Sequence, residues 1–213
     1  MKKLLLSILA IFLVIGLVGA GTFAWFQDQE TSTGNTFTAG TLDLRLHDGT
    51  TWVDGLIVAR WTGTNLAPGD SIGSNTIQLR EFGTIPADHL EITAEYTSTL
   101  ANDDDMARYL EITNLRYEDT DWYINLLTGE RWNIIGNVLL EGPRADWKVE
   151  DQDNRGWVSL YDLKVDPADN LPPPVGTYMF TMALRFNENA GNDLQGQTFN
   201  LSVVFTLNQD SSQ

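Results

Sequence analysis

Alternation of apolar and polar residues is the dominant pattern in the chain after residue 40. Alternation of this kind is typical of strands that bury one face and expose the other. It predicts strands at 42–46, 77–82, 90–96, 178–186 and 199–207.

Other segments interrupt or lose this alternation. The stretch 52–61 predicts a hairpin or a bulged strand, and 109–117, apolar on both faces, predicts a strand covered on both sides. The acidic segment 101–105 predicts a loop. From 120 to 143 the alternation fails, and short helices and irregular strands both stay open.

The set of elements predicts the fold class. About eight strands with turn signals between them, and no long helical period, indicate an all-β chain folded as an antiparallel β-sandwich. The length of 213 residues fits one sizeable β domain. We therefore expect a single domain over 37–213, with a less regular elaboration at about 119–171.

The N-terminus has the layout of a secretory signal. Lys2 and Lys3 precede an uninterrupted apolar run, Leu4–Val18, and small residues follow at 19–24. This order of basic, apolar and small residues predicts a signal peptide at 1–24, preceding the sandwich as a helix. It implies a secreted protein that contacts the membrane only transiently.

The residues around the cleavage point leave two positions open. Cleavage between Ala24 and Trp25 places Thr22 at the −3 position, and cleavage after Ala20 also satisfies the small-residue rule. The alternative is an uncleaved anchor, because the uncharged run 4–26 reaches the length of about 20 residues that spans a bilayer.

Composition narrows the function further. The formal net charge is −16, and a surface of that sign repels nucleic acid and anionic lipid. Cysteine is absent, so disulfides, thiolate metal sites and a cysteine nucleophile are all excluded.

The two histidines give no sign of catalysis. A zinc peptidase of the H-E-x-x-H type needs two histidines on one helix face, whereas His47 closes one predicted strand and His89 opens another. Alternation places His89 and Glu91 on one strand face, which we expect to be solvated. No nucleophile elbow or phosphate loop is present either, so we expect no enzymatic activity.

The segment 151–162, DQDNRGWVSLYD, resembles a calcium loop of the EF-hand or dockerin type. Asp151 and Asp153 stand at positions 1 and 3, Gly156 at position 6 and Asp162 at position 12. Calcium prefers hard oxygen ligands, and the glycine permits the sharp turn that gathers them. Ca²⁺ is therefore a possible cofactor, and no other is indicated.

Two features set this loop apart from the usual pattern. Trp157 would contribute its backbone carbonyl, but Arg155 occupies position 5, where an oxygen ligand is expected, and Asp162 is shorter than the usual Glu. The alternative is an acidic turn ahead of a short strand. The other acidic cluster, 103–105, is expected to be a solvated loop.

Three stretches carry a family resemblance. The first is GTFAWFQDQETSTGNTFTAGTLDL at 21–44, the second NLAPGD at 65–70, and the third QGQ at 195–197 followed by the strand 199–207. Together they resemble the TasA/camelysin family, biofilm matrix fibre proteins exported through a dedicated signal peptidase. The match at 35–44 is the most specific, and 119–171 carries no family pattern.

The resemblance implies a jelly-roll sandwich and assembly by donor-strand exchange (donor-strand complementation), in which the mature N-terminal arm of one subunit completes a sheet of the next. The arm would span 25–36. Its donor strand would consist of Trp25, Phe26, Gln27, Asp28, Gln29, Glu30, Thr31, Ser32 and Thr33.

Physical reasoning agrees with this implication. Trp25 and Phe26 would form an exposed aromatic pair on a free terminus, which is unfavourable in water unless they enter a groove. Strand addition supplies main-chain hydrogen bonds, and a head-to-tail contact propagates a polymer. The alternative is that the arm folds back on its own domain as an edge strand.

The sequence therefore predicts a secreted structural protein, a subunit of an extracellular, biofilm- or pilus-like filament. Its expected partners are other copies of itself and, during export, a signal peptidase. Two alternatives stay open. One is a camelysin-like surface metallopeptidase, and the other is a monomeric adhesion or carbohydrate-binding module at the cell surface, which seven tryptophans would permit.

Overall fold

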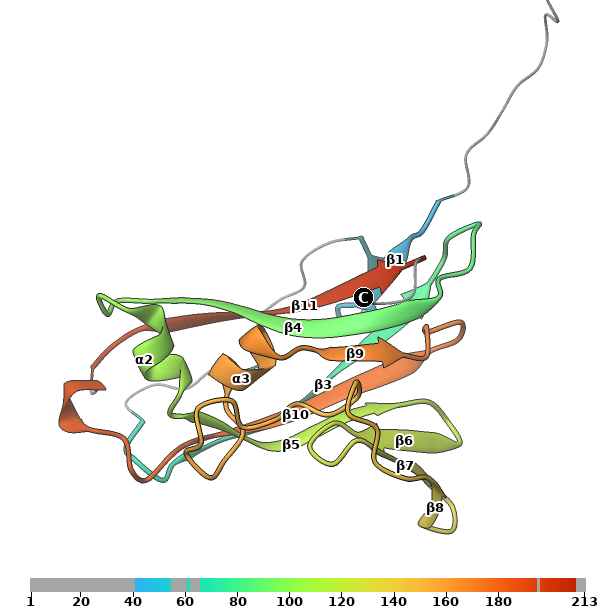
Figure 1. Ribbon diagram of the computed structural model, residues 1–213. Helices are drawn as coiled ribbons and strands as arrows, with labels where there is room; N and C mark the ends of the chain where they lie inside the picture. The colour runs from blue at the N-terminus through green and yellow to red at the C-terminus, as the bar shows by residue number, and fades with distance from the viewer. Residues whose placement is uncertain (1–40, 55–60, 62–65, 195, 210–213) are drawn as a thin grey trace, which may run out of the picture. The chain divides into compact units, whose positions relative to one another are not determined.

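The computed structural model describes residues 41–54, 61, 66–194 and 196–209 (Figure 1). The strands in this part of the chain are β1 Leu44–His47, β2 Trp52–Val53, β3 Ser71–Glu81, β4 His89–Ser98, β5 Leu110–Glu118, β6 Trp122–Asn125, β7 Glu130–Asn133, β8 Val138–Glu141, β9 Ala168–Leu171, β10 Tyr178–Phe186 and β11 Phe199–Asn208. The helices are α2 Asp103–Ala107, α3 Leu160–Val165 and the 3₁₀ turn η1 Asn192–Leu194.

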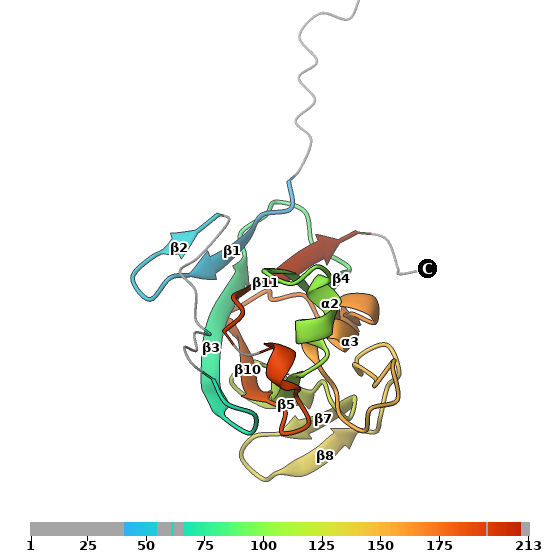
Figure 2. The same ribbon diagram turned by 90° about the vertical axis from the view of Figure 1, so that its left-hand side faces the viewer.

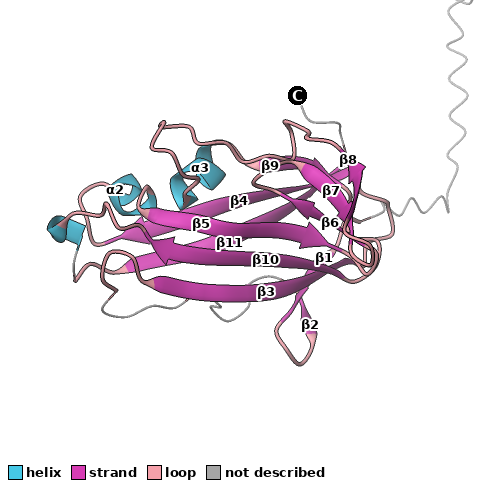
Figure 3. Cartoon of the chain, turned by 90° about the horizontal axis from the view of Figure 1, so that it is seen from below, coloured by secondary structure: helices cyan, strands magenta, loops and turns pink. Residues whose placement is uncertain are grey.

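The larger sheet has the order β2-β1-β3-β10-β5-β6-β7-β8, and every neighbouring pair is antiparallel (Figure 3). Its centre is β10, where Phe180 lies opposite Ile77 of β3 on one side and Tyr117 of β5 on the other. The strong alternation at 178–186 reflects this central position, since one face of β10 is buried along its whole length.

The smaller sheet has the order β11-β4-β9, again antiparallel. Viewed end-on, its strands face the larger sheet across the interior (Figure 2). The expected elaboration at 119–171 contributes to both sheets, because β6, β7 and β8 extend the larger sheet and β9 completes the smaller one.

The core fills the space between the sheets. Leu90, Ile92 and Ala94 of β4 are at most 1% exposed, and Phe180 of β10 is fully buried. The rings of Phe180 and Phe205 meet edge to face at 5.2 Å, which joins the two sheets directly. The predicted all-β antiparallel sandwich is confirmed.

The expected acidic loop at 101–105 is wrong in part, because α2 begins at Asp103. The side chain of Asn102 accepts from the backbone N–H of Asp104, and three aspartates in the first turn favour the positive end of the helix dipole. Asp104 also accepts hydrogen bonds from the Tyr96 hydroxyl at 2.8 Å and the Lys164 ammonium at 3.2 Å. The cluster thus fastens the helix to β4 and α3 instead of forming a purely solvated loop.

The structure also decides the predictions for two further segments, 120–143 and 109–117. In 120–143, the irregular-strand alternative is realised, as successive hairpins β6, β7 and β8. In β5, Leu115 and Tyr117 are buried, whereas Thr113 on the other face is exposed. The prediction that both faces of 109–117 are covered is therefore wrong, since a single face meets the core.

The predicted signal peptide, the cleavage residues and the donor arm lie outside the described residues, as does 55–60 of the expected hairpin. Within the described ranges, the helices are too short to cross a membrane.

Candidate functional site

The strand β11 forms one edge of the smaller sheet. Among the described strands it pairs with β4 alone, over its whole length from Phe199 to Asn208. β4, by contrast, has a strand on each side. One long side of β11 therefore faces no described strand.

The hydrogen-bond register shows which backbone groups of β11 face this free side. The N–H of Thr99 donates to the carbonyl of Thr198 at 3.0 Å, so this opposing pair belongs to the hydrogen-bonded class. In an antiparallel ladder this class recurs at every second residue. The N–H and carbonyl groups of Leu201, Val203 and Phe205 therefore point away from β4, toward the free edge.

The side chains of the same residues face the core but are incompletely covered. Leu201, Val203 and Phe205 are half-buried, whereas Ala94 and Ile92, opposite them on β4, are at most 1% exposed. The difference arises because β4 has neighbours on both sides. The edge strand leaves a strip of apolar surface in contact with solvent at the side of the sandwich.

A cavity of about 390 Å³ opens beside the start of β11. Its wall combines apolar residues of both sheets with residues from nearby loops. The members that matter here are Trp61, Ile72, Leu184, Phe186, Phe199 and Leu201. The cavity is therefore continuous with the half-buried side chains of β11.

The opposite wall of this opening also has an uncovered edge. Of the residues of β3, β1 pairs only with those in its second half, from Gln78 to Glu81. The first half of β3, which carries Ile72, has no described strand on that side. We call the region between this half of β3 and the free side of β11 the edge groove. It offers apolar contacts and a row of backbone groups that no described strand pairs with, which together suit one extended segment.

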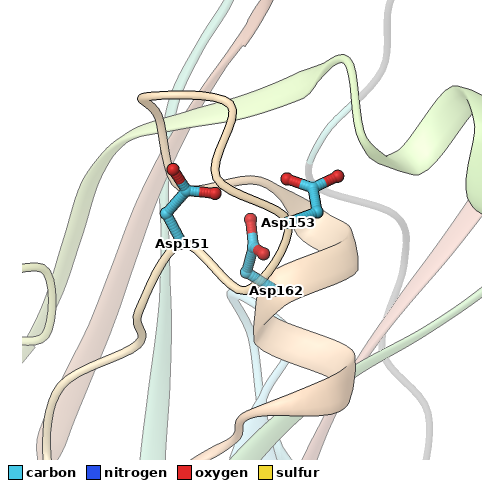
Figure 4. Close-up of side chains that lie close together, drawn as sticks. All are labelled: Asp151, Asp153 and Asp162. Carbon is cyan, nitrogen blue, oxygen red and sulfur yellow. The ribbon is translucent and has the colours of Figure 1, made fainter.

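The acidic loop 151–162 brings three carboxylates together. One oxygen each from Asp151, Asp153 and Asp162 lies within 4.8 Å of the others (Figure 4). Asp162 belongs to α3. The loop therefore leads into a helix, and the alternative of an acidic turn ahead of a short strand is wrong about the strand. The spacing of the carboxylates in the sequence thus translates into proximity in space.

Local hydrogen bonds explain why the loop closes in this form. Asp151 accepts from the backbone N–H of Arg155 at 3.1 Å and of Gly156 at 2.7 Å. Asp162 accepts from both the N–H and the hydroxyl of Ser159 at 2.7 Å, which caps α3. Asn154 and Gly156 have φ values of 58° and 90°, and the glycine adopts its value without steric cost.

Asp153 has two different oxygens. Oδ2 accepts from the guanidinium groups of Arg108 and Arg155, whereas Oδ1 is buried and has no partner among the described residues. The Arg155 guanidinium also lies 4.7 Å from the centroid of the Tyr109 ring. The cation at position 5 therefore pairs with a carboxylate of the cluster, at the place where a calcium loop has an oxygen ligand.

The environment shifts the pKa values of two of these groups in opposite directions. Burial raises the pKa of Asp162, and the hydrogen bond from Ser159 only partly opposes it. Burial also raises the pKa of Asp153, but hydrogen bonds from Arg155 and Arg108 outweigh it and leave the pKa below its ordinary value. Three close carboxylates form a donor set that suits a hard cation. Calcium binding at this loop, with a carbonyl ligand from Trp157, stays a prediction.

The Trp157 side chain serves the packing of the loop. Its indole N–H donates to the carbonyl of Arg108 at 3.0 Å, and its ring lies against that of Tyr109, with centroids 6.4 Å apart. These contacts fasten the loop to the end of α2 and the start of β5.

The expectation of a solvated His89 is wrong. His89 is only 4% exposed, and its Nε2 lies 3.3 Å from Asp169 Oδ1 and 3.1 Å from the Asn208 amide nitrogen. The strand β9, which carries Asp169, lies beside β4 in the sheet, and the sequence around His89 contains no sign of this neighbour. His47 lies on β1 of the other sheet. Among the described residues, the acidic loop is the one cluster of potential metal ligands.

The family of the chain follows from comparison with known proteins. The profile of a family described as "Camelysin metallo-endopeptidase" matches residues 1–213, the whole chain. No curated protein matches. This family includes TasA-like proteins, and its members are extracellular or cell-surface proteins. The chain therefore belongs to the TasA/camelysin family.

Proposed function

We propose that the protein is the structural subunit of an extracellular filament, in which residues 25–33 of one copy lie along β11 in the edge groove of the next. The observation that carries this proposal is the free edge of β11, with its half-buried apolar side chains and the adjoining cavity. A strand added there would satisfy the free N–H and carbonyl groups and remove apolar surface from water.

The geometry of such a contact favours a polymer. The donor arm and the edge groove are different surfaces, so each subunit uses one to give and the other to receive. A heterologous contact of this kind continues from subunit to subunit when the rotation does not close a ring. Aromatic residues suit the apolar cavity, and we assign Trp25 and Phe26 to it.

Disulfide cross-linking tests exchange directly, because the chain contains no cysteine. One preparation carries Ser202→Cys on β11, and a series of others carries single cysteines at 25–33. We expect the Ser202→Cys chain to form disulfide-linked pairs with a chain that carries a cysteine at some arm position. Thr97→Cys is the matched control, because Thr97 is as exposed as Ser202 but lies on β4, away from the free edge, and it should form no such pairs. Cross-links that form only within one chain carrying both cysteines would instead show that the arm folds back.

Electron microscopy of purified mature protein with and without residues 25–33 supplies the second test. Filaments should form only with the arm. Equal filaments from both preparations would contradict donor-strand assembly, and monomers from both would favour the binding module.

Export is part of the same proposal. Cleavage between Ala24 and Trp25 would free the donor strand at the mature N-terminus. N-terminal sequencing of protein recovered from the medium should begin at Trp25. A first residue of Gly21 would place the cut after Ala20, and an intact N-terminus would indicate the anchor.

A peptidase is the second candidate, because the family description names that activity. We propose a non-catalytic role, since His47 and His89 lie on different sheets and neither belongs to the acidic cluster. The purified protein should leave an unstructured protein substrate intact in the presence of Zn²⁺. Hydrolysis that a chelator abolishes and Zn²⁺ restores would establish the enzyme.

A further inference from the structure

The β7–β8 hairpin exposes a group of apolar residues outside the groove described above. Its members, with their exposed fractions, are Ile134 (43%), Ile135 (88%), Val138 (57%), Leu139 (45%) and Leu140 (50%). No charged residue occurs from 133 to 140, although the chain carries a net charge of −16. We call this group the hairpin patch.

The patch lies on an edge strand. β8 ends the larger sheet, and among the described strands it pairs with β7 alone. Natural edge strands usually carry charged residues or proline that discourage pairing with another chain. In β8, Val138, Leu139 and Leu140 carry neither a charge nor proline, and Glu141 at the end of the strand is the first charge. One irregularity is present, because the register with β7 shifts and leaves Leu140 without an opposing residue.

We propose that β8 pairs edge to edge with β8 of a second copy, in antiparallel orientation about a two-fold axis. With the axis at Leu139, Val138 lies opposite Leu140 of the partner subunit, so apolar residues face one another. Glu141 then lies beyond the paired residues, next to the turn of the partner subunit, because the positive φ of Asn137 places that residue outside the strand. A parallel pair in register would instead place Glu141 opposite Glu141 of the partner subunit, which like-charge repulsion disfavours.

The size of the contact determines its strength. A four-residue strand buries far less than the roughly 1,200 Å² of a stable interface, so an isolated pair is weak. β8 and β11 lie on opposite sides of the sandwich (Figure 2), so the hairpin patch stays accessible when the edge groove is filled. In a filament, which rests on the proposed function, many such contacts act together and join filaments side by side.

The test compares the purified protein with Leu139→Lys, which places two ammonium groups opposite each other at the axis. The matched control is Val175→Lys, because Val175 is 69% exposed in a loop outside the hairpin. Where filaments form, we expect wild type and Val175→Lys to associate laterally in electron micrographs. Leu139→Lys should give single filaments of unchanged length.

If no filaments form, the proposed function fails, and sedimentation equilibrium of the soluble protein then tests the β8 contact on its own. The wild type should then show a weak monomer–dimer equilibrium, and Leu139→Lys should raise its dissociation constant at least about tenfold. Equal self-association of the two proteins, by either method, would overturn the proposal. So would binding of the patch to neutral lipid vesicles in place of self-association.

Discussion

Replacing Val203 with proline tests the free side of β11 without removing a hydrogen bond on the side that pairs with β4. The N–H of Val203 points toward the free edge, so its loss removes no hydrogen bond to β4. Proline is tolerated at such positions of edge strands. The folded subunit should therefore keep its sandwich, and Val203→Ala provides a matched control that trims the side chain but retains the N–H.

The expected effect on assembly follows from the free backbone groups. A strand lying along β11 would hydrogen-bond to Leu201, Val203, Phe205 and Leu207, each bond contributing about 0.5–1.5 kcal/mol net. Proline removes one of these bonds, and its ring obstructs the approach of the added strand beside it. We expect each junction to lose about 1–3 kcal/mol, which weakens it by roughly a factor of 5 to 150.

The assay is the critical concentration for filament growth, measured by light scattering and by the protein that remains soluble after sedimentation. Val203→Pro should raise it by about tenfold or more relative to Val203→Ala. Thermal unfolding of the monomers checks that both variants fold. Val204→Pro, which removes a bond to β4, should instead lower the melting temperature. Equal critical concentrations for Val203→Pro and Val203→Ala would refute strand addition at this edge.

Two further predictions concern the acidic groups. The pKa of Asp104, like that of Asp153, lies below its ordinary value of 3.8 because hydrogen bonds, from Tyr96 and Lys164 at Asp104, outweigh the rise caused by burial. The stability that these carboxylates contribute is therefore present above pH 3.8 and is lost as the pH falls through the lowered pKa values. Urea titrations at decreasing pH should show a smaller fall in the free energy of unfolding for Asp104→Asn than for the wild type. An equal fall in both proteins would contradict this prediction. Calcium titration by calorimetry should show binding that the double variant Asp151→Ala, Asp153→Ala abolishes and Asp193→Ala retains, and affinity unchanged in the double variant would remove the site.

The two strands with the clearest alternation were the most predictable elements, whereas β3, the longest described strand, was predicted only from residue 77 onward. The alternation at 178–186 and 199–207 reproduces β10 and closely matches β11, because one face of each strand meets a continuous core. The helices were missed, although each had a local signal: Asn102 before three aspartates for α2, and Ser159 with Asp162 three residues later for α3. Short helices carry too few apolar residues to show a period.

The two candidate sites differ in how far apart in the sequence the residues lie that form them. Spacing within twelve consecutive residues sufficed to bring Asp151, Asp153 and Asp162 together, since the loop closes on its own backbone. The ion pair of Asp153 with Arg108, by contrast, joins the loop to the end of α2, which the spacing within the loop does not show. The edge groove was beyond sequence reasoning, because alternation shows which face of a strand is buried but not which strand lies beside it.

In the proposed filament, the position of β11 in the chain sets the order in which a subunit acquires its two contact surfaces. Synthesis proceeds from the N-terminus, so the proposed donor arm at 25–33 would be available before β3, β4 and β10 have formed. β11 follows all of these strands in the sequence, and the edge groove is complete only when it has joined β4. A subunit of the proposed filament would thus be able to donate before it can receive, and the filament would gain its next docking place only after the newest chain has been released in full.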